Sequence, residues 1–137
     1  MKHLSFEQLY HTDFQISEPL AKQQSWATRG NLYSALGKPK ISHTLLWFKN
    51  CEASISLPSG EQIPCGRNSL VYMAKGIEYA VHFSSTGADI EDTVVVHFQM
   101  TDKSGEDICP SDRPIVCLRS VDSATAMLLD SMVEECK

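Results

Sequence analysis

The stretch Leu-Val-Tyr-Met-Ala-Lys-Gly-Ile-Glu-Tyr-Ala-Val-His-Phe (residues 70–83) decides the fold of this chain. An apolar run over residues 70–73 is followed by a Lys-Gly turn, and residues 77–83 then alternate between two faces. Ile77, Tyr79, Val81 and Phe83 fall on one face, opposite Glu78, Ala80 and His82. A period of two is typical of a half-buried β-strand. Short strands separated by Gly turns predict a small β-barrel.

The sequence on both sides of this stretch continues the strand pattern. Residues 51–57 alternate cleanly, with Cys51, Ala53, Ile55 and Leu57 on one face. Residues 93–100 are dense in β-branched side chains, which favour strands. Glu18-Pro19 predicts a turn or an extended lead-in. Further strands are predicted over residues 26–33, 42–49, 61–64 and 114–119.

The periodicity changes near the C-terminus. Asp122 or Ser123 can cap a helix, because either side chain accepts a hydrogen bond from a free backbone N–H. Apolar side chains then recur every three or four residues up to Cys136, without a Gly or Pro stop. We therefore expect a helix that continues in the natural protein. The alternative is a C-terminal helix that packs on its own barrel.

Length and composition restrict the function. At 137 residues the chain is long enough for one domain. The net charge is −5, and the largest basic cluster, Lys38-Pro39-Lys40, is expected in a solvated loop, so this chain alone is not expected to bind DNA. No apolar run approaches the length needed to span a membrane, and residues 1–7 lack the apolar core of a signal peptide, so we expect a cytoplasmic location with no membrane partner. Five cysteines without C-x-x-C spacing predict reduced thiols.

Part of the chain resembles the metal-binding motifs of the cupins. In that family, a Gly precedes H-x-H and a Glu on one strand pair, and P-x-G precedes a third His. Gly37 stands six residues before His43, which fits the first ligand. The remaining ligand positions carry Leu45, Lys49 or Asn50, and Tyr79. Because a divalent metal usually needs three protein ligands, we predict no metal, no cofactor and no catalysis.

The chain is more similar to the N-terminal sensor domain of AraC-family transcription regulators. The resemblance rests on Ser-His-Thr-Leu-Leu-Trp-Phe (42–48), on Gly-Glu-Gln-Ile-Pro-Cys-Gly-Arg-Asn-Ser-Leu-Val-Tyr-Met-Ala-Lys-Gly-Ile-Glu-Tyr (60–79) and on Thr-Val-Val-Val-His-Phe-Gln-Met-Thr-Asp (93–102). It covers roughly residues 40–102. Asn68 stands where the family often has Asp, and Ala74 where it often has Pro.

This resemblance implies a mainly β fold, a cupin-type jelly-roll barrel over residues 1–120. Residues 121–137 would begin a dimerisation or linker helix. The implied function is to bind a small-molecule effector, such as a carbohydrate, and to form a homodimer. DNA would be contacted only through a C-terminal domain absent from this chain. The alternatives are a small cupin enzyme, such as a sugar isomerase or a metal-dependent oxygenase, and a stand-alone small-molecule-binding protein.

Six side chains are candidates for contacts with the effector: Arg29, His43, Trp47, Tyr79, His82 and His97. Trp47 and Tyr79 would form an aromatic wall, and the guanidinium of Arg29 would pair with an anionic group. The three histidines would make polar contacts inside the barrel. The alternatives are core packing for the aromatic residues, a surface role for Arg29, and outward-facing or hydrogen-bonded core positions for the histidines. The sequence contains no recognisable catalytic nucleophile–base arrangement.

Overall fold

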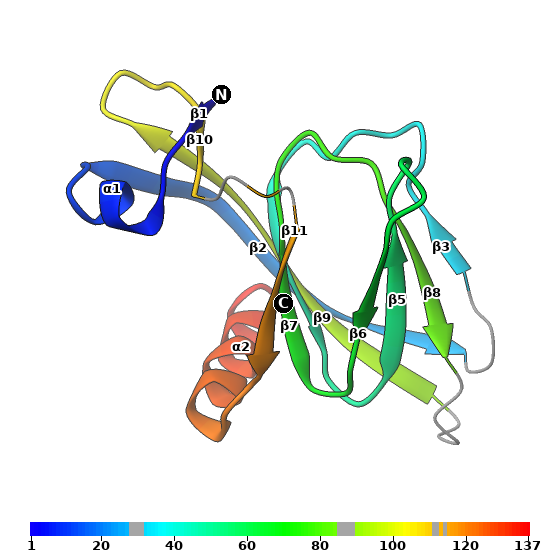
Figure 1. Cartoon of the computed structure of the whole chain (residues 1–137). Helices are drawn as coiled ribbons and strands as arrows, with labels where there is room; N and C mark the ends of the chain where they lie inside the picture. The colour runs from blue at the N-terminus through cyan, green and yellow to red at the C-terminus, as the bar shows by residue number, and fades with distance from the viewer. Residues whose placement is uncertain (28–31, 85–89, 111–112, 114) are drawn as a thin grey trace.

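The computed structural model describes residues 1–27, 32–84, 90–110, 113 and 115–137. These residues form two β-sheets packed face to face and a separate two-stranded sheet, with helices outside the packed pair (Figure 1). The helices are α1 (Phe6–Tyr10) and α2 (Ser123–Glu135). The strands are β1 (Lys2–His3), β2 (Phe14–Ala27), β3 (Leu32–Ser34), β4 (His43–Phe48), β5 (Glu52–Ser56), β6 (Gln62–Cys65), β7 (Ser69–Met73), β8 (Ala80–Ser84), β9 (Ile90–Asp102), β10 (Ile108–Cys109) and β11 (Ile115–Ser120).

The chain passes repeatedly from one sheet to the other. The larger sheet has the strand order β11-β7-β4-β9-β2, and the smaller sheet has the order β3-β8-β5-β6. All strand pairs in these two sheets are antiparallel, whereas β1 and β10 form a separate parallel pair. This alternation between two antiparallel sheets is the arrangement of a jelly roll. The predicted mainly β jelly roll with a C-terminal helix is therefore confirmed.

The first hydrophobic core lies between the two sheets. The alternation predicted for residues 51–57 is confirmed, because Ile55 is fully buried in this core. Val81 and Phe83 point into it from β8. β8 begins at Ala80 rather than at residue 77, because the carbonyls of Ile77 and Tyr79 accept hydrogen bonds from the loop over residues 35–40 instead of from a strand.

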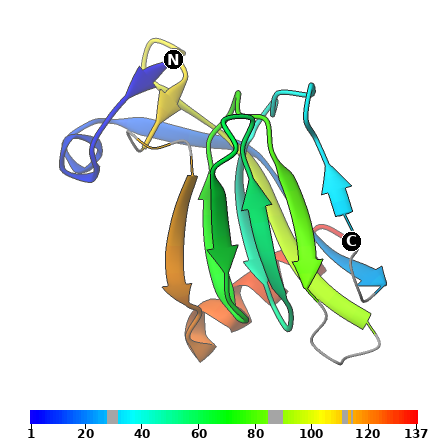
Figure 2. The same ribbon diagram turned by 45° about the vertical axis from the view of Figure 1, so that its right-hand side comes forward.

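A second core covers the outer face of the larger sheet. Trp47 and Val94 are buried there beneath Leu129 and Val133 of α2. In both ribbon views α2, coloured orange to red, lies against this sheet (Figure 1, Figure 2). The predicted cap is confirmed, because the Asp122 carboxylate accepts a hydrogen bond from the backbone N–H of Thr125 at 2.7 Å. β4 carries apolar side chains on both faces, because one face lies in the first core and the other in the second.

The N-terminal third of the chain holds elements that the sequence pattern did not predict. β2 pairs with β9 at the edge of the larger sheet. α1, β1 and β10 lie near the start of β2 and the end of β9, where Phe14 pairs with Asp102 (Figure 1). Glu18, with a φ of 53°, and Pro19 form a β-bulge within β2, so the chain stays extended instead of turning. Proline is tolerated there because an edge strand leaves one row of N–H groups unpaired. The strand predicted over residues 26–33 is divided between β2 and β3, and residues 28–31 lie outside the described residues.

Candidate ligand-binding cavity

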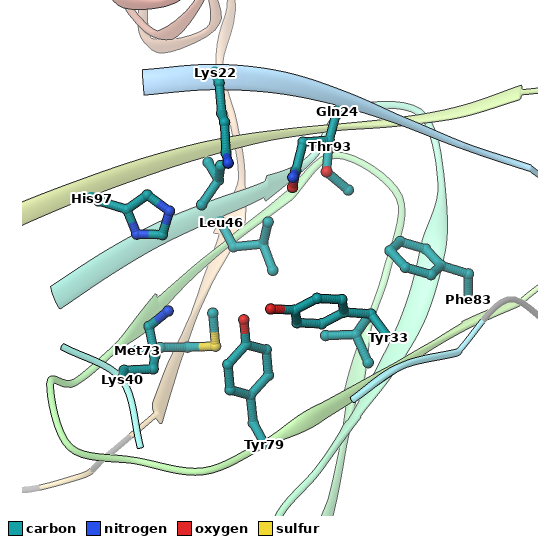
Figure 3. A pocket seen from close by; sticks show the side chains of 12 residues that line it. Lys22, Gln24, Tyr33, Lys40, Leu46, Met73, Tyr79, Phe83, Thr93 and His97 are labelled. Atoms are coloured by element: carbon teal, nitrogen blue, oxygen red, sulfur yellow. The ribbon is translucent and has the colours of Figure 1, made fainter. Parts of the chain in front are cut away.

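A cavity of about 120 Å³ lies between the two sheets, on the side where β2 and β3 form the edges. Its floor is apolar, and its rim carries amines, an imidazole, an amide and hydroxyls (Figure 3). The apolar lining consists of Leu46, Met73, Val81, Phe83 and Val95. The polar lining consists of Lys22, Gln24, Tyr33, Lys40, Tyr79, Thr93 and His97.

Strand register explains why several of these side chains share the cavity. Thr93, Val95 and His97 are two residues apart on β9, so they point to the same face. Lys22 and Gln24 of β2 lie opposite Val95 and Thr93 in the antiparallel pair, which gives them the same orientation. The intervening valines of β9 face α2 instead, in the second core.

Lys40 is held in place through its backbone. Its N–H donates to the carbonyl of Ile77 at 2.9 Å, and its own carbonyl accepts from the N–H of Gly76 at 2.8 Å. Gly76 has a φ of +93°, a conformation that favours glycine, and this turn brings residues 76–77 against Lys40. The two hydrogen bonds fix the point from which the Lys40 side chain enters the cavity.

The Lys40 ammonium is half-buried, and its nearest charge-compensating contact among the described residues is an aromatic ring. Nζ lies 5.1 Å from the centre of the Tyr79 ring, and no carboxylate in the described part of the chain forms an ion pair with it. Burial lowers the pKa of Lys40 to about 8, because the charged form loses hydration. A cation in this position is only partly compensated, and an anion placed beside it would restore the lost stabilisation.

His97 lies between Lys40 and Lys22 (Figure 3). Its Nδ1 is 3.1 Å from Oγ1 of Thr44 and 3.3 Å from Oγ of Ser42. Burial lowers the pKa of His97, and the charges of Lys40 and Lys22 lower it further. The imidazole is therefore mainly neutral near pH 7, so the positive charge at this site belongs to the lysines.

Two tyrosines complete the polar rim. The rings of Tyr33 and Tyr79 have centroids 5.9 Å apart, and both hydroxyls point into the cavity (Figure 3). Burial raises the pKa of Tyr79, and the neighbouring Tyr33 raises it further. The Tyr79 hydroxyl therefore keeps its proton and can donate a hydrogen bond to a bound oxygen.

An apolar groove of about 400 Å³ adjoins the cavity and shares Tyr33, Lys40, Tyr79 and His97 with it. Its remaining lining is apolar at Leu20, Ala35, Pro39 and Ile41, and charged or polar at Glu18, Lys38, Ser42 and Gln99. Lys40 thus lies where the cavity meets the apolar groove. Chemically, this arrangement suits a molecule with one anionic group and an apolar body.

The structure brings together only part of the site suggested by the sequence. Tyr79 and His97 line the cavity. Trp47 faces the second core, where its indole N–H donates to Oδ1 of Asn68 at 2.9 Å, so it forms no wall with Tyr79. His82 is exposed on the outer face of the smaller sheet. Arg29 lies outside the described residues.

His43 is fully buried on the face of β4 opposite the cavity. Its Nδ1 lies 2.8 Å from the Tyr72 hydroxyl and accepts from the N–H of Lys75 at 3.2 Å. The cupin motif would assign this histidine to a metal inside the barrel, but its side chain points away from the interior. Leu45 shares its face of the strand. The residues at these positions do not fit a cupin metal site, and the described residues contain no cluster of three or more metal-ligating side chains.

Sequence reasoning missed the lysines and Tyr33. Lys40 belongs to the Lys38-Pro39-Lys40 segment, which was assigned to a solvated loop. Lys22 lies in a polar segment without hydrophobic periodicity. Lys22 and Gln24 are two residues apart and share a face of β2. This spacing points to a common site only once residues 14–27 are known to form a strand.

Comparison with known proteins gives matches of fold and not of sequence. No protein-family model matches the chain, and no curated protein does. ToxT from Vibrio cholerae O395, bound to (E)-4-(8-methylnaphthalen-1-yl)but-3-enoic acid, superimposes with a TM-score of 0.55 at 9% identity, covering 89% of this chain and 48% of ToxT. Another V. cholerae ToxT structure gives 0.52 at 9% identity, with coverages of 87% and 47%. YhaK from Escherichia coli gives 0.50 at 15% identity, with coverages of 74% and 44%.

The present chain spans about half the length of each of these proteins. At such low identity the likeness concerns the fold. The chain has the cupin-like jelly-roll fold of ToxT and YhaK, as the sequence resemblance implied.

Proposed function

We propose that this chain is the ligand-sensing and dimerisation domain of a bacterial AraC-type transcription regulator, and that the domain itself performs no catalysis. ToxT, which shares the fold, is an AraC-family regulator, and one of its structures contains a bound carboxylic acid. The observation that carries the proposal for this chain is the half-buried Lys40 ammonium, which forms no ion pair with any described residue and lies where the cavity meets an apolar groove.

The effector is an acid with an apolar body. Its carboxylate, or an equivalent anion, accepts hydrogen bonds from Lys40 and from the Tyr79 hydroxyl, with Lys22 adding positive charge. The apolar body packs on Leu46, Met73 or the adjoining groove, where each buried methylene contributes about 0.8 kcal/mol. A carbohydrate fits less well, because it would use the polar rim but would place hydroxyl groups against the apolar floor.

Dimerisation uses the outer face of α2. Leu129 and Val133 of α2 pack on the larger sheet, while Met127 and Leu128 are 71% and 62% exposed. These two side chains form an apolar surface that a second copy of the chain covers. The helix therefore begins the dimerisation segment expected from residue 121 onward.

Contact with DNA belongs to a separate domain of the whole protein. The net charge of −5 opposes binding of nucleic acid by this chain. The protein acts in the cytoplasm, where such a regulator meets its DNA. Neither described helix has the length and the apolar character that a bilayer crossing requires.

Thermal unfolding tests the effector class. A ligand that binds only the folded protein raises its melting temperature. We expect a medium-chain or aryl-substituted carboxylic acid to raise the melting temperature, and the alcohol of the same carbon skeleton and a set of sugars to have little effect. Equal effects of acid and alcohol would contradict the anionic class, and a response to sugars alone would favour a carbohydrate effector.

DNA binding separates a regulator from a stand-alone binding protein, because both would hold the acid in this cavity. The experiment is a mobility-shift assay with the full-length protein and its own upstream DNA, with and without the acid. We expect the acid to change the affinity for DNA. A full-length protein that binds the acid but no DNA would support the stand-alone alternative.

A further inference from the structure

A pair of cysteines lies on the side of the molecule opposite the cavity. β6 is the edge strand of the smaller sheet, and β11 is the edge strand of the larger sheet. Figure 2 shows β11, in brown, beside the green strands of the sandwich. Cys65 ends β6, and Cys117 lies in the middle of β11. Each sheet thus contributes one thiol at the same open side.

Strand register directs both side chains into the space between the sheets. Cys65 lies opposite Ala53, which is 5% exposed in the first core. Cys117 lies opposite Val71, which is fully buried in the same core. Directly opposed residues of an antiparallel pair point to the same face. The two cysteines therefore face each other across the edge of the sandwich.

The two thiols are in contact. Cys117 is a hydrogen-bonding partner of Cys65, and its presence adds to the effect of burial, which raises the pKa of Cys65 to about 12. Cys65 is buried, whereas Cys117 is exposed. The exposed member is accessible to a dissolved oxidant, and the buried member, whose thiol donates to the carbonyl of Ile63 at 3.5 Å, lies next to it.

We propose that Cys65 and Cys117 are a redox-sensitive pair that hydrogen peroxide converts into an intramolecular disulfide between the two sheets. This proposal does not depend on the ligand or on DNA binding. Disulfides in the cytoplasm are usually transient and redox-sensing rather than structural. A solvent-accessible thiol next to a second cysteine is the usual arrangement of such a sensor.

The chemistry has two steps. The Cys117 thiolate attacks one peroxide oxygen, the O–O bond breaks, and the departing hydroxide takes up a proton as water, leaving a sulfenic acid on Cys117. The Cys65 sulfur then attacks the Cys117 sulfur, the S–O bond breaks, and the Cys65 proton leaves with the hydroxide as a second water. Overall, two thiols and one peroxide give one disulfide and two waters.

The other cysteines have different surroundings. Cys51 and Cys109 are buried. Cys136 is exposed like Cys117, but it lies at the end of α2, where its sulfur accepts a hydrogen bond from the N–H of Ala21 at 3.3 Å. Cys136 is therefore a matched control, since it is an exposed thiol on another element.

The test oxidises the reduced, desalted chain with hydrogen peroxide and follows its intact mass and its peptide map. We expect the loss of two hydrogen atoms per chain, a Cys65–Cys117 linked peptide, and reversal by dithiothreitol. Because the cross-link closes a long loop between edge strands, the oxidised form should melt roughly 5 °C or more above the reduced form.

Variants separate the two steps. Cys117→Ser, a change at an exposed site, should abolish the disulfide, and Cys136→Ser should leave it unchanged. Cys65→Ser should leave a Cys117 sulfenic acid that dimedone traps. Oxidation of Cys117 without loss of two hydrogen atoms, or a disulfide that joins other cysteines, would overturn the proposal. Because Cys117→Ser and Cys136→Ser leave the buried core intact, the test stands even where Cys65→Ser does not fold.

Discussion

The Lys40 ammonium lies 5.1 Å from the centre of the Tyr79 ring, at the junction of the cavity and the apolar groove. The electron-rich face of the ring attracts the cation, but such a contact contributes only about 0.5–2 kcal/mol. It does not restore the hydration lost on burial, and this deficit is why the pKa of Lys40 falls to about 8. The charge of Lys40 is therefore only partly compensated in the unliganded protein.

Lys40→Met should weaken binding of an apolar acid about tenfold or more, because the charge-assisted hydrogen bond to its carboxylate is lost. The same change should raise the free energy of unfolding by about 1 kcal/mol, because an apolar side chain of similar length needs no hydration. Isothermal titration calorimetry and urea unfolding measure the two effects. The control is Lys103→Met, which removes an exposed lysine whose pair with Asp13 lies on the surface. An unchanged affinity in Lys40→Met would contradict the role of Lys40.

The affinity for an apolar acid should decrease as the pH rises above about 8. In the free protein Lys40 loses its proton near that pH, whereas a bound carboxylate favours the charged ammonium and raises its pKa. Below pH 8 the lysine is protonated with or without ligand, so the affinity should be nearly constant between pH 6 and 8. Calorimetry across pH 6–10 measures the profile. A profile in Lys40→Met that matches the wild type would assign the titration to another group.

The stability of the unliganded protein should show the opposite trend over the same range. The folded pKa of Lys40 lies below its unfolded value of 10.5, so the folded state carries an unfavourable charge at every pH below about 8. That penalty is relieved progressively between pH 8 and 10.5. The difference in free energy of unfolding between Lys40→Met and wild type should therefore shrink across this window, as urea titrations at each pH would measure. A constant difference would argue against burial as the cause of the shifted pKa.

Asn68→Ala should destabilise the fold by about 2–4 kcal/mol. The Asn68 side chain accepts from the Trp47 indole at 2.9 Å and donates to the carbonyl of Val121 at 2.8 Å. Its φ of 65° is also a conformation that Ala adopts poorly. Asn68→Gly keeps the backbone conformation and loses only the hydrogen bonds, so it should destabilise the fold less than Asn68→Ala in urea unfolding. Equal losses of stability in Asn68→Ala and Asn68→Gly would show that the backbone conformation contributes nothing. The control is His82→Ala, which should have little effect on stability because His82 is exposed.

Met127→Glu combined with Leu128→Glu should convert a dimer into a monomer without loss of stability. Both side chains are mostly exposed in a single chain, so their replacement removes little packing within the folded domain. Sedimentation equilibrium measures the mass, and thermal unfolding of the isolated monomer checks the fold. A double variant that remains dimeric would place the interface elsewhere on the chain. A wild-type chain that is monomeric at high concentration would contradict dimerisation through this chain.

Much of the fold was predictable because exposed and buried residues alternate. Residues 51–57 and 77–83 have one polar face and one apolar face, and the structure buries the apolar one. The C-terminal helix was predictable from the Asp122 cap and the change of period. β2 was not, because an edge strand with polar residues on both faces, such as Lys22 and Gln23, has no hydrophobic period.

The candidate site was less predictable, because it depends on which face of each strand looks inward. β4 is apolar on both sides, so alternation alone could not tell that Thr44 and Leu46 face the cavity side while His43 and Trp47 face the second core. Lys40 lies in a loop, and its place beside Tyr79 depends on hydrogen bonds to residues 76–77, which are distant in the sequence.

The most direct test is the crystal structure of the chain with an apolar carboxylic acid that raises its melting temperature. The account predicts the carboxylate within hydrogen-bonding distance of Lys40 Nζ, with the apolar body in the cavity or in the adjoining groove. An acid bound elsewhere on the chain, or one whose carboxylate points to solvent away from Lys40, would contradict it.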